Sequence, residues 1–242
     1  MTQGRDLPAD VAPRQALDDA LTAVKRRVTF KEPANAWTHF IATFAALGGA
    51  AYLLSMSWGS GAKFWSLLAY SIGFVGVFLS SSVYHFFDLG PRWNRWLRRF
   101  DHMAIFVMIA GSYVPMLVHF LTGRWRAYML ASVCGVALVG IIFKLLWVEA
   151  PKFIGVSLYL AMGWMVVVAA PVLSKTLPMD VFVWLAIGGV IYSVGALVYA
   201  LKRPNPWPQT FDSHAIWHLF VIGGAAAHFV AMVKVLPLSV PM

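Results

Sequence analysis

Residues 181–201 read VFVWLAIGGVIYSVGALVYAL, an apolar segment that contains no charged side chain. A helix of about 20 such residues crosses the ~30 Å hydrocarbon core of a bilayer. Six further apolar segments of similar length lie near residues 37–57, 64–86, 101–121, 127–147, 153–173 and 214–236. Because backbone polar groups cannot be left bare in lipid, the sequence predicts an all-α fold, a seven-transmembrane helix bundle.

The composition supports this class of protein. The chain has 242 residues, of which 60% are hydrophobic and 12% charged, whereas a soluble domain carries about 25% charged residues. The single cysteine, Cys134, excludes an intramolecular disulfide and is expected to be buried as a small apolar side chain. The first 35 residues contain no apolar core of a signal peptide, so the first span is expected to act as its own insertion signal.

The positive charge predicts the orientation in the membrane. The net charge is +9, and 14 of the 19 Lys and Arg residues fall in the N-terminal tail or around the gaps after the second, fourth and sixth spans. Cytoplasmic loops carry such an excess, so we expect a cytoplasmic N-terminus. Because the charge follows the loops, it does not indicate a nucleic-acid partner.

Two regions are expected, a cytoplasmic tail over residues 1–35 and a transmembrane domain over residues 36–242. In the tail, residues 13–29 carry apolar side chains at helical spacing, which predicts a short amphipathic helix on the inner membrane surface. A partly disordered tail is the alternative. The side chains that set this pattern are Leu17, Leu21, Val24 and Val28.

Four ionisable residues are expected at one depth. His85 ends the second span, Asp101 begins the third, and His214 and His218 lie in the first turns of the seventh. Ionisable groups inside a membrane are costly and usually functional. The alternating direction of the spans places all four near the cytoplasmic face.

These histidines have the spacing of a metal site. His214 and His218 are four residues apart and therefore share one helix face. With His85 they offer three imidazoles and an open position, which is typical of catalytic zinc. Histidines that bind backbone carbonyls in the core would give the same pattern, so that reading stays open.

Ser81 and Asp101 are the candidate catalytic residues beside this site. Ser81 is one turn before His85, where its hydroxyl can orient a water or a ligand. Asp101 can act as a general base. The plainer readings are helix packing for Ser81, and an ion pair with Arg98 or Arg99, or a helix cap, for Asp101.

Other polar and small residues are given lesser roles. His39 is expected at the interface, His102 is expected to point about 100° away from Asp101, and His228 lies about 15 Å beyond His218, too deep for the same ion. Five glycines are expected to permit close helix contacts. They are Gly73, Gly76, Gly111, Gly223 and Gly224.

Three motifs resemble the hemolysin III branch of the progestin and adipoQ receptor family. They are residues 80–85 (SSSVYH), residues 100–115 (from FDH to AGSYVP), and residues 213–218 (SHAIWH) with 227–229 (AHF). The resemblance covers roughly residues 30–236. It implies seven spans with an inward N-terminus, and zinc held by one histidine of the second span and two of the seventh. Those positions match His85, His214 and His218.

The same resemblance matches Ser81 and Asp101 to the family's serine and aspartate and links the fold to ceramide hydrolysis. The short tail differs from the receptor branch and favours a bacterial-type member in the inner (plasma) membrane. The sequence therefore predicts a zinc-dependent hydrolase acting on an amide or ester of a membrane lipid, with a ceramide-like or other acyl lipid as partner. The alternatives are a non-enzymatic sensor or receptor with structural zinc and a hemolysin-type cytolytic protein.

Overall fold

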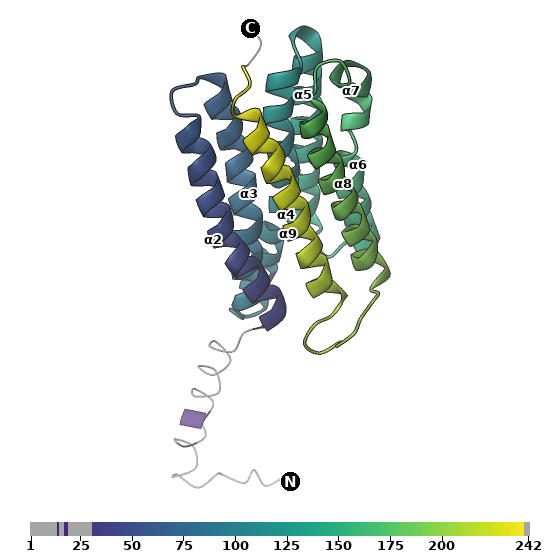
Figure 1. Ribbon diagram of the computed structural model, residues 1–242. Coiled ribbons are helices and arrows are strands. Elements are labelled where there is room, and N and C mark those ends of the chain that lie inside the picture. The colour runs from purple at the N-terminus through teal and green to yellow at the C-terminus, as the bar shows by residue number, and fades with distance from the viewer. Residues whose placement is uncertain (1–13, 15–16, 19–30, 240–242) are drawn as a thin grey trace, which may run out of the picture.

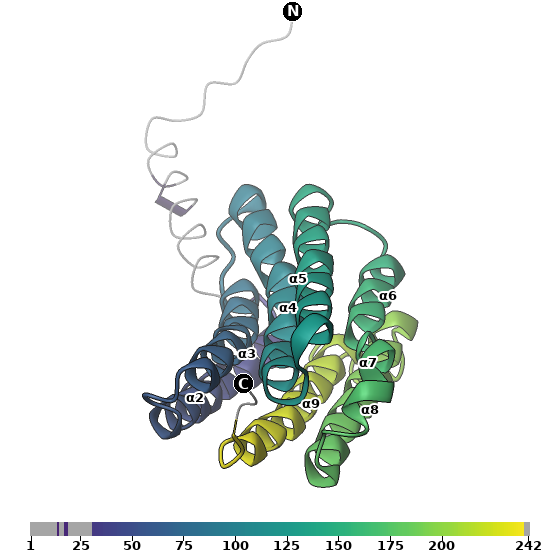
Figure 2. The ribbon, with the colours of Figure 1, turned by 90° about the horizontal axis from the view of Figure 1, so that it is seen from above.

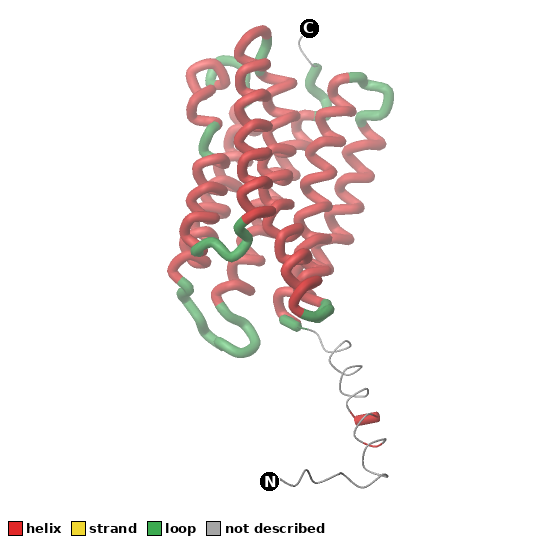
Figure 3. The backbone as a smooth tube through the Cα atoms, turned by 180° about the vertical axis from the view of Figure 1, so that it is seen from behind, coloured by secondary structure: helices red, strands yellow, loops and turns green. Residues whose placement is uncertain are grey.

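The computed structural model describes residue 14, residues 17–18 and residues 31–239. In this part of the chain the fold is helical, and the only strand-like pairing is one bridge between Trp207 and Phe211 (Figure 3). The helices are α2 (Pro33–Met56), α3 (Ala62–Phe86), α4 (Pro91–Phe120), α5 (Gly123–Leu146), α6 (Lys152–Gly163), α7 (Val166–Leu173), α8 (Met179–Leu201) and α9 (Ser213–Val235). They make seven spans over the described residues, because α6 and α7 together form one.

The predicted all-α, seven-span fold is therefore confirmed. The predicted amphipathic helix over residues 13–29 falls almost entirely outside the described residues. The cytoplasmic N-terminus and the division of the chain after residue 35 remain predictions.

The third helix begins ten residues before its predicted start at residue 101. α4 starts at Pro91, which suits the first turn of a helix because its missing N–H has no intrahelical role there. The predicted start was set where the apolar segment meets the charged residues, but a helix can continue beyond the hydrocarbon core of the bilayer. The arginines of this segment are therefore helical and not in a loop.

The bundle is closed by its last helix. α2, α3, α4 and α5 pack in sequence order, and α9 lies between α2 and α8 (Figures 1 and 2). α2 begins and α9 ends at opposite ends of the bundle (Figure 1). The first turns of α2 and α9 therefore meet the C-terminal end of α3 at one end, where the predicted histidines lie.

Close contact between α3 and α4 depends on two glycines. A Cβ atom on Gly73 would lie 2.7 Å from the Cα of Met108, and one on Gly111 would lie 2.8 Å from the carbonyl oxygen of Ala69. Small residues let membrane helices approach in this way. The same expectation is wrong for Gly76, because nothing lies within 4 Å of a Cβ placed there.

The fifth span is broken between α6 and α7. Tyr113 of α4 donates its hydroxyl hydrogen toward the carbonyl oxygen of Gly163 (2.6 Å), and the same hydroxyl oxygen accepts from the backbone N–H of Val166 (2.9 Å). Backbone groups freed inside a membrane need such partners. The sequence does not predict this break, since the apolar pattern continues through it.

The outer surface of the spans is apolar and fits contact with lipid tails. Ile41 and Phe44 on α2 and Val139 on α5 are more than half exposed. Cys134 also lies exposed, on a face of α5 that no neighbouring helix covers, so its expected burial is wrong.

Candidate metal centre

The structure brings the three predicted histidines together. His85 comes from the end of α3, and His214 and His218 come from the first two turns of α9. Their ring centroids lie 4.8 to 5.1 Å apart. One nitrogen of each ring lies within 4.8 Å of the corresponding nitrogens of the other two. Three imidazoles therefore converge on one point.

The rings are oriented by groups at the start of the first span. The Nδ1 of His85 lies 2.7 Å from the Oε2 of Glu32, and the Nδ1 of His218 lies 3.2 Å from the carbonyl oxygen of Asn35. If each Nδ1 carries the hydrogen, it donates to that oxygen and leaves the Nε2 lone pair available. Metal-binding histidines usually have a carboxylate or carbonyl partner of this kind.

Glu32 is held in turn by its neighbours. Its Oε2 accepts a hydrogen bond from the Nδ2 of Asn35 (2.7 Å), and its backbone N–H donates to the carbonyl oxygen of His85 (3.2 Å). Partial burial acts to raise the pKa of Glu32, but its contacts with His85 and Asn35 bring that pKa down to about 2. The carboxylate is therefore ionised at neutral pH.

His39 also belongs to this cluster, and its expected interfacial position is wrong. It is 3% exposed, and its ring stacks on that of His218 with centroids 3.8 Å apart. Glu32, Asn35 and His39 were missed as a group. Their spacing of three and four residues places them on one helix face, which is the signal that could have found them.

Asp101 is buried inside the bundle at 8% exposure. Its Oδ2 lies 2.9 Å from the Nδ1 of His102, so these side chains do meet although their Cβ positions diverge around the helix. Asp101 is not a helix cap, because α4 begins ten residues earlier. Its ion-pair partner among the described residues is His102 and neither Arg98 nor Arg99.

A cavity of about 700 Å³ extends from this cluster into the bundle. Asp101, Ser81 and His214 line it at the histidine end, together with His39 and His218. Ser81 is 2% exposed and lies one turn before His85. Both candidate catalytic side chains and two of the three histidines, His214 and His218, therefore line one space, and His85 lies behind them without lining it.

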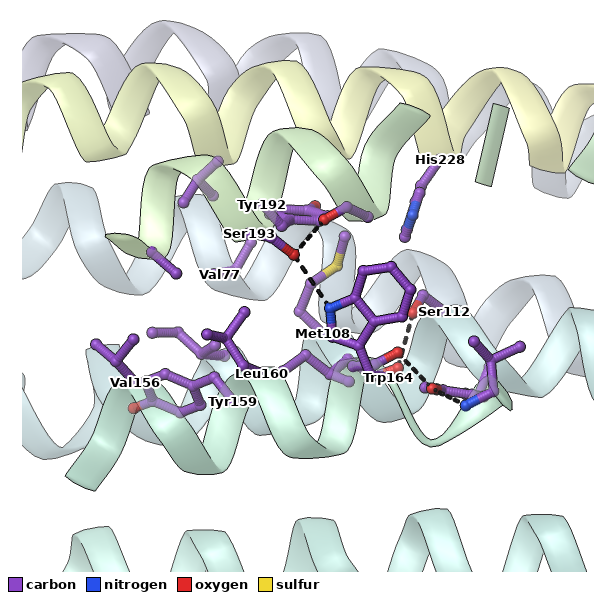
Figure 4. A pocket seen from close by; sticks show the side chains of 18 of the residues that line it. Val77, Met108, Ser112, Val156, Tyr159, Leu160, Trp164, Tyr192, Ser193 and His228 are labelled. Carbon is purple, nitrogen blue, oxygen red and sulfur yellow. Dashed lines mark hydrogen bonds between the residues drawn. The ribbon is translucent and has the colours of Figure 1, made fainter. Parts of the chain in front are cut away.

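The deeper part of the cavity is mostly apolar and is bounded by α4, α6 and α8 (Figure 4). Val156, Leu160 and Met108 line it, and the indole N–H of Trp164 donates to the Oγ of Ser193 (3.1 Å). His228 lies in this inner part, near Tyr192 (Figure 4), and it is not a member of the three-histidine group, as its sequence position predicts. The volume is within the range of about 300–1,000 Å³ typical of small-molecule sites.

The donor set fits zinc. The Nε2 of His85 is fully buried and has no hydrogen-bond partner among the described residues, which leaves a lone pair free for a cation. His85 and His218 each have an oxygen partner for the other nitrogen. Three neutral imidazoles without a fourth protein ligand are a known zinc set.

Comparisons with known proteins agree with the architecture. A family model described as "Haemolysin-III related" matches residues 28–229. The "Hemolysin-3 homolog" of Bacillus subtilis is 34% identical over 201 residues, which cover 82% of this chain and 91% of the relative. The "Hemolysin-3" of Bacillus cereus is 34% identical over 203 residues, covering 82% and 89%. The human "Monocyte to macrophage differentiation factor" is 30% identical over 215 residues, covering 86% and 85%. The seven spans and the Bacillus relatives identify a multi-pass integral membrane protein and agree with the expected bacterial plasma membrane.

Proposed function

This chain belongs to the haemolysin-III related family, and on that premise we propose that it is a zinc-dependent membrane hydrolase that cleaves an amide or ester bond of a membrane lipid. The observation that carries the proposal is the shared cavity. A three-histidine cluster with a zinc-type donor set borders, through His214 and His218, a largely apolar space that Asp101 and Ser81 also line. An acyl chain fits such a space, and a scissile carbonyl would then lie at its polar end.

His85, His214 and His218 would hold the zinc, with Glu32 and Asn35 fixing two of the rings. When bound, zinc supplies Lewis acidity that polarises a carbonyl and makes water more acidic. This end of the bundle would face the cytoplasm, as the positive charge bias of the sequence predicts.

Asp101 would accept the proton of the attacking water and pass it to the leaving group. The neighbouring His102 holds the carboxylate in place through its Nδ1. Ser81 would position the water by a hydrogen bond from or to its hydroxyl. Burial of these groups among apolar helices excludes bulk water and strengthens their interactions with charge that develops in the reaction.

The experiment is a fatty-acid release assay with the purified protein in detergent, on a panel of acyl lipids that includes ceramide. We expect release by the wild type and none by His218→Ala. Asp101→Asn should lose turnover but keep its zinc, as measured by metal analysis. Asp180→Asn is the matched control, because Asp180 pairs with Lys234 at the exposed start of α8. A zinc-loaded wild type that releases no fatty acid from any lipid would contradict the proposal.

A non-enzymatic sensor is the second candidate, and one observation favours it. The histidine cluster joins α3 to α9 and contacts α2 through Asn35, so a metal there would clamp the bundle. Loss of thermal stability on chelation, combined with no turnover, would support this role. The cytolytic role suggested by the relatives' printed names would require leakage from liposomes that contain the protein.

A further inference from the structure

Three cationic side chains line the same cavity beside the histidine cluster. They are Arg98 of α4, Lys144 of α5 and Lys152 of α6. Arg98 lies within electrostatic reach of both lysines. Because like charges repel, grouping these three cations costs free energy unless an anion binds between them.

Lys144 is the least expected of the three. It is 3% exposed, and the neighbouring Gly155 leaves room for it, since a Cβ on Gly155 would lie 2.8 Å from the Lys144 Nζ. Its aromatic contact is with Phe143, 5.4 Å from Nζ to the ring centroid. A lysine whose role is only to keep a loop on the cytoplasmic side is expected to be exposed to water, and Lys144 is not. A buried ammonium needs a counter-charge.

The carboxylates of this end of the bundle are already engaged. None of the ion pairs among the described residues involves Arg98, Lys144 or Lys152. Asp101 pairs with His102, and Glu149 pairs with Arg95 outside the cavity.

Two further carboxylates act on Lys152 from a distance without an ion pair. Asp212 accepts from the N–H groups of His214 and Ala215 at the start of α9, and Glu32 holds His85. The nearby Lys202 adds further positive charge. We call the part of the cavity lined by Arg98, Lys144 and Lys152 its mouth. This mouth therefore carries more positive than negative charge.

The cations lie close to the proposed reaction centre. The Nζ of Lys152 is 4.3 Å from the centroid of the Tyr199 ring, and that ring is 5.2 Å from the ring of His214. On the other side, the Lys144 Nζ occupies the space where Gly155 lacks a Cβ. Tyr159, one turn after Gly155, donates to the carbonyl oxygen of His102 (3.1 Å). An anion held here would lie next to both the histidines and Asp101.

We propose that this mouth binds the phosphate of a lipid headgroup, so that the substrate is an anionic, phosphate-bearing acyl lipid and not neutral ceramide. The identification as a substrate rests on the proposed function, whereas the binding does not. Lysine is a point-charge partner for phosphate, and arginine binds phosphate through paired N–H groups. The acyl chains would occupy the apolar part of the cavity.

The test measures binding, separately from turnover, on protein purified in an uncharged maltoside detergent, which carries no phosphate. The probes are phosphatidic acid, diacylglycerol with the same acyl chains, and inorganic phosphate. We expect phosphatidic acid to bind, diacylglycerol to bind at least tenfold more weakly, and inorganic phosphate to bind far more weakly because it lacks the chains. Equal binding of diacylglycerol would overturn the inference, and so would equal binding of free phosphate.

Charge variants identify the site. Lys144→Gln should weaken phosphatidic acid binding roughly tenfold to a hundredfold, as expected for loss of one charged hydrogen bond, and Lys144→Arg should retain it. Without anionic lipid, Lys144→Gln should melt at the same temperature as the wild type or higher, because a buried, unpaired charge is removed. Lys175→Gln, at an exposed lysine outside the cavity, is the matched control and should change nothing. Unchanged binding by both Lys144→Gln and Lys152→Gln would overturn the inference.

The two proposals fail separately. Binding of phosphatidic acid by His218→Ala, together with no hydrolysis by the wild type, would remove the proposed hydrolase and keep the binding site. Hydrolysis of ceramide that Lys144→Gln leaves unchanged would keep the hydrolase and overturn the anionic substrate.

Discussion

Glu32 offers a direct test of how the histidine cluster is held. It contacts no proposed position of the metal, yet its Oε2 lies 2.7 Å from the Nδ1 of His85. Glu32→Gln keeps the size and an acceptor oxygen and removes the negative charge. We expect this variant to bind zinc more weakly, because His85 loses the charged partner that fixes its tautomer and raises its basicity.

The size of the effect follows from the contact. A hydrogen bond to a charged group contributes about 1.5–3 kcal/mol and a neutral one about 0.5–1.5 kcal/mol, so the substitution removes roughly 1–2 kcal/mol. At about 1.4 kcal/mol per tenfold change, zinc affinity should fall about fivefold to thirtyfold. The Glu32 side chain is 38% exposed, which favours the lower half of that range through solvent screening.

The assay is competition for zinc between the purified protein and a chromophoric chelator at neutral pH. Glu149→Gln is the matched control, because Glu149 forms an ion pair with Arg95 in which both side chains are exposed. Melting curves without metal show whether the variants are folded. Affinity of Glu32→Gln within twofold of the wild type would refute the reasoning, as would an equal loss in Glu149→Gln.

Three further outcomes are expected. Gly73→Ala should lower the free energy of unfolding by about 1–3 kcal/mol, because the new methyl group meets the α4 backbone. Gly76→Ala is the control and should leave it unchanged, and equal melting temperatures of the two variants in detergent would argue against this close contact. Tyr113→Phe should lower the free energy of unfolding by about 1–3 kcal/mol, because the backbone at the α6–α7 break loses its hydrogen-bond partner. Tyr128→Phe, at an exposed tyrosine, is its control and should change that free energy by no more than about 0.5 kcal/mol in the same melting experiments. Zinc chelation should lower the melting temperature of the wild type but not that of His218→Ala, and an identical shift in both would place the bound metal elsewhere.

The sequence predicted those features that depend on hydropathy and chain direction. The long apolar segments predicted seven spans, and the alternating direction of those spans predicted that His85, His214 and His218 lie at the same end of the bundle. Helical spacing of four residues then placed two of the histidines on one face. These predictions needed no knowledge of side-chain contacts.

The features it missed depend on packing. His39 looked interfacial because only its place in the span was known, whereas the stacking on His218 depends on how α2 meets α9. Cys134 looked buried because an apolar run does not tell which of its faces contacts lipid. The break after Gly163 depends on a hydroxyl from another helix, which no local pattern contains.

The histidine cluster also bears on how the protein is made. His85 leaves the ribosome well before His214 and His218, which lie in the last of the described helices. A nascent chain therefore cannot assemble the three rings until α9 has entered the bilayer and inserted between α2 and α8. Truncated products that lack α9 would keep most of the spans and none of the three-ring arrangement, so metal loading would distinguish finished molecules from incomplete ones.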